Sequence, residues 1–178
     1  MSVRLSLLAL LDQGACYGYQ LRSELDWRTG GTGPINVGQI YNTLDRLERD
    51  KLVQKTGENN YYEITPAGRT EVTAWFGSPS PASELAAKLA LAATLPGVDV
   101  ARVIRIQRAA LLGTSADIAE PNTPQQLAAA VVASASVLAN RAERQLLGEA
   151  ERLLGLGIAP VLLSSDVPKR GRPAKVAG

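Results

Sequence analysis

Apolar residues recur at helical spacing along the first thirty residues of the chain. Residues 3–12 are strongly apolar and are followed by Gly14, which favours a buried helix that ends there. Residues 17–25 begin a second helix, in which Leu21 and Leu25 lie on the inner side. The hydrophobic pattern therefore predicts two consecutive helices at the start of the chain.

A third helix is predicted for residues 36–51, and its two sides differ in chemistry. Asn36 followed three residues later by Gln39 is typical of a helix start, where both side chains satisfy free backbone amides. One side of the helix is apolar and carries Ile40, Leu44 and Leu47. The opposite side is polar and carries Gln39, Asn42, Arg46 and Arg49. Such amide and guanidinium groups pair with base edges in a DNA major groove, although a solvated helix face has the same pattern.

A short β-hairpin is predicted after this helix. Two stretches of β-branched and aromatic residues, 52–56 and 60–65, flank the turn at 57–59. Thr65-Pro66 then predicts the start of another helix, because proline suits the first helical position. Helix, helix, turn, helix and hairpin is the order of a winged helix-turn-helix, so we expect residues 1–76 to form a DNA-binding domain of this kind.

Three motifs in this order resemble the PadR family of bacterial transcriptional regulators. They are Leu5-x-Leu7-Leu8 with Tyr17-Gly18-Tyr19-Gln20-Leu21, Gly38-Gln39-Ile40-Tyr41-x-x-Leu44-x-Arg46-Leu47-Glu48, and Tyr61-Tyr62-x-Ile64-Thr65-Pro66-x-Gly68-Arg69. The resemblance covers about residues 3–76 and implies a homodimeric winged-helix repressor. It further implies that Tyr19 and Tyr41 contact phosphates and that the face from Gln39 to Arg46 enters the major groove.

The predicted wing departs from the pattern of that family. Wings in the family are often rich in Arg or Lys, whereas this one has Glu58 near its tip and Lys55 as its cation. A strong contact between the wing and phosphates is therefore in question. The candidate DNA contacts of the domain are Tyr19, Asn36, Gly38, Gln39, Tyr41, Asn42, Arg46, Lys55 and Asn60.

The second half of the chain is predicted to be helical, which makes the protein mainly α. Residues 77–83 are rich in Ser and Pro and predict a linker, and residues 84–158 predict a helical dimerisation domain. We expect helices at 84–94, 99–119 and 124–154. The last helix carries an apolar stripe longer than two short helices can cover, which favours packing against a second subunit over a three-helix bundle within one chain. The stripe consists of Leu127, Val131, Leu138, Ala142, Leu146 and Leu153.

Positive charge is concentrated at the end of the chain. Residues 1–76 contain 8 Lys and Arg against 9 Asp and Glu, whereas residues 166–178 contain 4 against 1. We expect residues 159–178 to form a flexible basic tail. Within it, a short run resembles an AT-hook, in which arginines around a glycine follow a narrow A·T minor groove. That run consists of Lys169, Arg170, Gly171, Arg172 and Pro173. A solubilising tail is the alternative.

The composition of the chain argues against catalysis, metal binding and a membrane span. The chain has no histidine and one cysteine, so we expect no cofactor, no metal site and no enzyme activity, with Cys16 a small buried hydrophobe. There is no apolar run long enough for a membrane span and no signal-peptide pattern at the start, which predicts a cytoplasmic, nucleoid-associated protein. The expected partners are double-stranded DNA and a second copy of the chain. Two alternatives stay open: a winged-helix module that binds protein, and a regulator that binds a hydrophobic effector between subunits.

Overall fold

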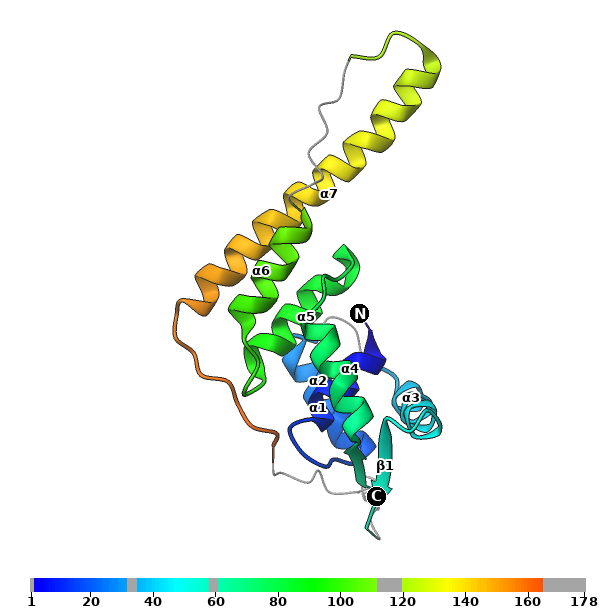
Figure 1. Ribbon diagram of the computed structural model, residues 1–178, viewed down its shortest axis with the longest axis vertical. Coiled ribbons are helices and arrows are strands. Elements are labelled where there is room, and N and C mark those ends of the chain that lie inside the picture. Colours follow the sequence, from blue (N-terminus) through cyan, green and yellow to red (C-terminus); the bar gives the residue numbers. More distant parts are fainter. Residues whose placement is uncertain (1, 32–34, 58–60, 112–119, 165–178) are drawn as a thin grey trace, which may run out of the picture.

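The computed structural model describes residues 2–31, 35–57, 61–111 and 120–164 (Figure 1). The winged helix-turn-helix, here called the head, consists of α1 (Val3–Leu11), α2 (Gly18–Arg28), α3 (Val37–Arg49), β1 (Val53–Thr56), β2 (Tyr61–Ile64) and α4 (Pro66–Phe76). The helical body consists of α5 (Ala82–Thr94), α6 (Val100–Leu111) and α7 (Pro124–Leu154). Figure 1 shows the head at one end of the molecule and α7 projecting away from it. The predicted mainly α fold with an N-terminal winged helix is confirmed.

Helix α1 lies at the centre of the head. It contacts α2, α3 and α4, and from Ser6 to Leu11 it is buried on all sides because neighbours cover each side. Four leucines of this helix are at most 1% exposed: Leu7, Leu8, Leu10 and Leu11. Burial of one such side chain contributes about 2 kcal/mol. The other helices of the head therefore take their positions from α1.

The wing is a two-stranded antiparallel hairpin, as predicted. Val53 pairs with Ile64, and Lys55 pairs with Tyr62. An additional bridge joins the hairpin to the start of α2, because Cys16 and Tyr62 exchange two backbone hydrogen bonds of 3.0 and 2.7 Å. The wing is thereby fixed to the same part of the chain that precedes Tyr19.

The body packs around a second apolar cluster, and α7 joins it with only its C-terminal part. Leu147 is completely buried against α5 and α6, and Leu146, Ala150 and Leu154 lie at the edge of the cluster. In Figure 1 the N-terminal part of α7 extends beyond both neighbouring helices. Among the described helices, none combines the length and apolarity that crossing a bilayer requires.

The segment between head and body is packed, contrary to the linker predicted for residues 77–83. Ser80 is 8% exposed, and both its backbone groups bond to the side chain of Gln107. The ammonium group of Lys88 donates a 2.6 Å hydrogen bond to the carbonyl of Ser78. Helix α5 already begins at Ala82. Two buried polar side chains of the body therefore hold the segment through its backbone.

The chain after α7 also differs from its prediction. We expected a flexible tail from residue 159 onward, but residues 161–164 run along α2 and bond to it. We call residues 161–164 the strap. Helix α2 continues to Arg28, three residues beyond the predicted stretch, and α6 is described to Leu111, so the predicted continuation to 119 lies outside the described residues.

Candidate nucleic-acid interface

Helix α3 is held by its cap and by its apolar side. Asn36 is the N-cap, and its side-chain oxygen accepts a 2.8 Å hydrogen bond from the amide of Gly38. Ile40, Leu44 and Leu47 are completely buried in the head. Because the apolar side is fixed against α1 and α2, the opposite side faces solvent.

The exposed side of α3 presents three polar groups without partners. Gln39, Asn42 and Arg46 are exposed, and within the described chain their side chains form no hydrogen bond or ion pair. Arg49, which the pattern placed on the same side, pairs instead with Asp50 at 3.2 Å. Two amides and one guanidinium are thus available for bidentate bonds to base edges.

Tyr19 lies in the first turn of α2, and Tyr41 on α3 packs against that turn at Gly18. Tyr41 lies so close to Gly18 that a Cβ built on the glycine would be 2.7 Å from the Tyr41 Cε1 atom. Tyr19 and Tyr41 remain 43% and 37% exposed. Their hydroxyl groups are suited to donate hydrogen bonds to phosphate oxygens, the contacts that fix the orientation of a protein on DNA.

Lys55 forms an ion pair within the head. Its ammonium group lies 2.6 Å from the carboxylate of Glu48 on α3 and 5.4 Å from the centre of the Tyr62 ring. The hydrogen bond with Glu48 raises the pKa of Lys55 above its ordinary value. The wing cation expected to contact phosphate is therefore paired with α3, and the other wing candidate, Asn60, lies outside the described residues.

Most cations of the head are already paired, which sequence reasoning missed. Five of its eight Lys and Arg residues form ion pairs with carboxylates: Arg4, Arg28, Arg49, Lys55 and Arg69. A sixth, Arg22, donates to the carbonyl of Ile35. In the described part of the head, Arg46 and Lys51 are left for phosphates. The Arg4–Glu71 and Arg69–Asp12 pairs join residues 67 and 57 positions apart in the chain, so no local pattern reveals them.

The predicted dimerisation stripe mostly faces away from the body. Leu127, Val131, Leu138 and Leu153 are between 48% and 62% exposed. Leu146 differs, because it packs partly against the cluster of its own chain. Leu147, which the prediction omitted, faces the body; it lies one residue and about 100° from Leu146 on the helix.

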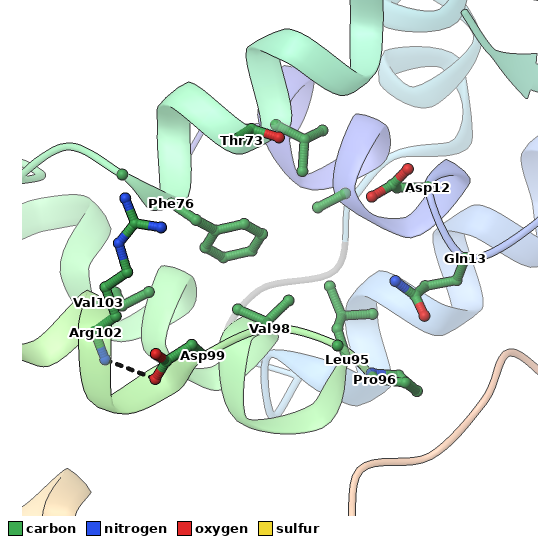
Figure 2. A pocket seen from close by; sticks show the side chains of 14 residues that line it. Asp12, Gln13, Thr73, Phe76, Leu95, Pro96, Val98, Asp99, Arg102 and Val103 are labelled. Atoms are coloured by element: carbon green, nitrogen blue, oxygen red, sulfur yellow. Dashed lines mark hydrogen bonds between the residues drawn. The ribbon is translucent and has the colours of Figure 1, made fainter. Parts of the chain in front are cut away.

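A cavity of about 320 Å³ lies where the head meets the body (Figure 2). Its walls come from the ends of α1 and α4 and from the turn between α5 and α6. Figure 2 shows Phe76 and Arg102 at one end and Asp12 and Gln13 at the other, with Leu95 and Val98 between them. Its size falls within the range of small-molecule sites. Elsewhere, the described residues contain no group of three His, Cys, Asp or Glu side chains arranged to hold a metal ion.

The buried three-helix core, the exposed face of α3 and the wing define the class of winged helix-turn-helix transcriptional regulators. Within that class, residues 7–74 match the model of the Transcriptional regulator PadR-like family. The predicted family resemblance is thus confirmed for the head. No curated protein matches the chain.

The chain is also similar to solved structures that span both head and body. The virulence activator AphA of Vibrio cholerae is 22% identical over 88% of this chain and 100% of its own, with a TM-score of 0.40. The PadR-like regulator BC1756 of Bacillus cereus is 20% identical over 85% and 99%, with a TM-score of 0.41. Bacillus subtilis PadR, solved in complex with operator DNA, is 18% identical over 86% and 98%, with a TM-score of 0.39.

Proposed function

We propose that this transcriptional regulator binds a specific DNA sequence by inserting α3 into the major groove. The observation that carries the proposal is the exposed side of α3, where Gln39, Asn42 and Arg46 have no partner in the described chain. In this proposal Tyr19 and Tyr41 position the head on phosphates. The rival function as a protein-binding module relied on acidic side chains of the head, and five of those nine carboxylates are occupied by ion pairs.

The proposed functional unit is a homodimer formed through α7. The exposed stripe and the buried Leu147 lie on different sides of the helix, so one helix can serve its own body and a second copy at once. Two heads related by a twofold axis would read a palindromic operator and block transcription there. The tail residues Lys169, Arg170 and Arg172, which lie outside the described residues, would follow flanking A·T-rich minor groove.

Base reading is tested with Asn42→Ala and Arg46→Ala in the full-length chain. We expect each variant to bind DNA from its own upstream region about 5- to 160-fold more weakly, because one bidentate base contact contributes about 1–3 kcal/mol. Arg105→Ala is the control, since it removes an exposed cation on α6. Unchanged affinity and unchanged site preference in both α3 variants would refute the proposal.

Dimerisation is tested with Val131→Glu and Leu138→Glu by sedimentation equilibrium. A charge on the stripe should shift the protein toward monomer. Ala129→Glu is the matched control, because it places the same charge about 160° around the helix from Val131. Equal dissociation of all three variants would mean that the stripe is not the interface.

A response to a small molecule is the second candidate function, and the cavity in Figure 2 favours it. We expected an effector between subunits, whereas this cavity lies within one chain. Phe76 offers a planar apolar surface, and Arg102 lies beside it at the same end of the cavity. A thermal-shift screen should find compounds that stabilise the native protein but not Val98→Trp, which fills the cavity. Equal stabilisation of both proteins would place the binding elsewhere.

A further inference from the structure

We propose that Arg28 is a positioning residue that, together with the strap, fixes the angle between the head and the body. In a dimer that binds DNA, this angle sets the distance between the two heads and hence the spacing of the half-sites that the protein accepts. The inference rests on the DNA-binding function proposed above. It gives a role in DNA binding to buried groups that lie away from the exposed side of α3.

Arg28 joins three parts of the chain. Its side chain is completely buried, and its Nε atom lies 2.9 Å from the carboxylate of Glu24, one turn earlier on α2. Its Nη1 atom donates a 2.6 Å hydrogen bond to the carbonyl of Thr94, the last residue of α5. Its Nη2 atom donates to the strap carbonyls of Val161 and Leu162, at 2.9 and 3.2 Å. One guanidinium group therefore links the head, the body and the strap.

The strap also bonds to the two other partners of Arg28. The amide of Val161 donates to the same carbonyl of Thr94 at 3.1 Å, and the amide of Ser164 donates to the second carboxylate oxygen of Glu24 at 2.8 Å. Figure 1 shows the chain returning from the end of α7 to the head. Because hydrogen bonds are stronger where water is excluded, we expect loss of the strap to weaken the bond between Arg28 and Thr94.

Apolar contacts also join the head to the body through α5. Leu91 and Leu95 are buried in the cluster of the head, whereas Leu85 and Leu89 on the same helix are buried in the cluster of the body. Hydrophobic burial is non-directional, so these contacts hold α5 in place without fixing its angle closely. A guanidinium group presents its donors in a fixed planar geometry. Arg28 therefore determines the angle that the apolar contacts leave open.

The cavity of Figure 2 lies directly beside this contact. Leu95, the residue after Thr94, lines the cavity, and Ala9 of α1 and Phe76 of α4 line it from the head. Atoms that border an unfilled space have no packed neighbour on that side to resist a displacement. The junction of head and body is thus open on the side of the cavity, and the polar contact at Thr94 holds it.

The chemistry of the contact indicates that its role is geometric. Burial of the charges of Arg28 and Glu24 carries a desolvation cost, and apolar residues of similar volume often give equal stability. The strap is held through its backbone, since the side chains of Val161 and Leu162 are 52% and 70% exposed. Directed hydrogen bonds define an orientation at this junction, which apolar burial alone does not define.

The half-site spacing selected by the full-length protein tests the proposal. Operator fragments from its own upstream region would differ by single base pairs between the half-sites, and each base pair also rotates one half-site by about 34°. We expect the wild-type protein to bind one spacing about tenfold more tightly than spacings two base pairs longer or shorter, because a misplaced head loses base contacts.

Two variants release the contact in different ways. Glu24→Leu with Arg28→Met removes both charges together, so no unpaired charge stays buried. Val161→Pro removes the amide that bonds to Thr94 and leaves the ion pair in the core intact. Both variants should bind the three spacings within about twofold of one another. Arg4→Met is the control, because the ion pair of Arg4 with Glu71 lies wholly within the head, and it should keep the tenfold preference.

Hydrogen exchange of the DNA-free proteins shows whether the strap has been released. The amide of Ser164 should exchange slowly in the wild-type protein and in Arg4→Met, and rapidly in the two other variants. Rapid exchange with an unchanged spacing preference would overturn the proposal, and so would slow exchange in both of those variants. Site-specific binding by the wild-type protein without a preferred spacing would overturn it too, while leaving the proposed DNA-binding function standing. Absence of site-specific binding would refute that function itself.

Discussion

The side-chain amide of Gln107 bonds both backbone groups of Ser80, accepting from its amide at 2.7 Å and donating to its carbonyl at 3.0 Å. Gln107 therefore pairs with the backbone of Ser80 through one donated and one accepted hydrogen bond, as a neighbouring β-strand would. In a third hydrogen bond, Gln107 donates to the carboxylate of Glu143 on α7 at 3.0 Å. The segment between head and body, α6 and α7 therefore share one buried polar contact.

Gln107→Ala should destabilise the protein by about 2–4 kcal/mol. The substitution leaves the amide and carbonyl of Ser80 buried without partners, and each such group costs about 1–3 kcal/mol. Urea unfolding measures the change in the free energy of unfolding. Arg108→Ala, on the next residue of α6, removes an exposed ion pair with Glu151 and should leave the free energy of unfolding nearly unchanged. A similar small effect for Gln107→Ala would contradict the structural role of this contact.

Gly18→Ala should weaken DNA binding while nearly preserving stability. The new Cβ would displace the Tyr41 ring, which is partly exposed and free to turn away. Loss of one phosphate contact of about 1 kcal/mol corresponds to roughly a fivefold weaker affinity. Gly68→Ala is the contrast, because its Cβ would lie 2.3 Å from the backbone carbonyl of Leu52 and should unfold the head. Thermal unfolding and DNA titration of both variants separate the two effects.

Because of Lys88, the free energy of unfolding should rise with pH between about 8 and 10.5. Burial lowers its pKa from 10.5 to about 8, and Glu84 opposes the change only weakly. In this window the unfolded chain holds a proton that the folded chain has released, so each increase in pH favours the folded state, by about 3 kcal/mol in total. Lys88→Met should remove this part of the pH dependence. Urea midpoints of both proteins at pH 7.5, 9 and 10 give the difference, and parallel curves would refute the assignment.

Cys16 should be inert in the folded protein. The side chain is completely buried, and burial raises the pKa of its thiol to about 12, so the reactive thiolate is scarce at neutral pH. Ellman's reagent should react with it only as fast as the chain unfolds. The same thiol in the urea-unfolded chain should react at once and serves as the comparison. Rapid modification of native Cys16 would instead indicate an accessible thiol.

The sequence predicts those features that depend on neighbouring residues. The cap of α3 at Asn36, its apolar stripe and the hairpin between residues 53 and 64 follow from local periodicity and turn chemistry. The polar side of α3 is predictable for the same reason, because its direction is fixed by the opposite, buried side. These local signals are sufficient to identify the head.

Contacts between distant segments could not be predicted in the same way. The Lys55–Glu48 pair removes a candidate phosphate contact, and hydrogen bonds from Arg28 hold the strap, the described start of the expected tail, against α2. Leu146 and Leu147 both fit a helical stripe, and only the position of α6 decides which of them is buried. Periodicity gives the faces of a helix, but the neighbouring elements decide which face they cover.

The length of α7 has a mechanical consequence. About 20 of its 31 residues precede Glu143, whose carboxylate accepts a hydrogen bond from Gln107 on α6, and they span roughly 30 Å. This projecting part can tilt as a rigid helix about the polar contact at Gln107. A tilt of about 6° at this contact moves the far end by about 3 Å, close to the rise of one base pair. In the proposed dimer, a rearrangement of a few degrees at the base of α7 would therefore change the distance between the two heads by about one base pair.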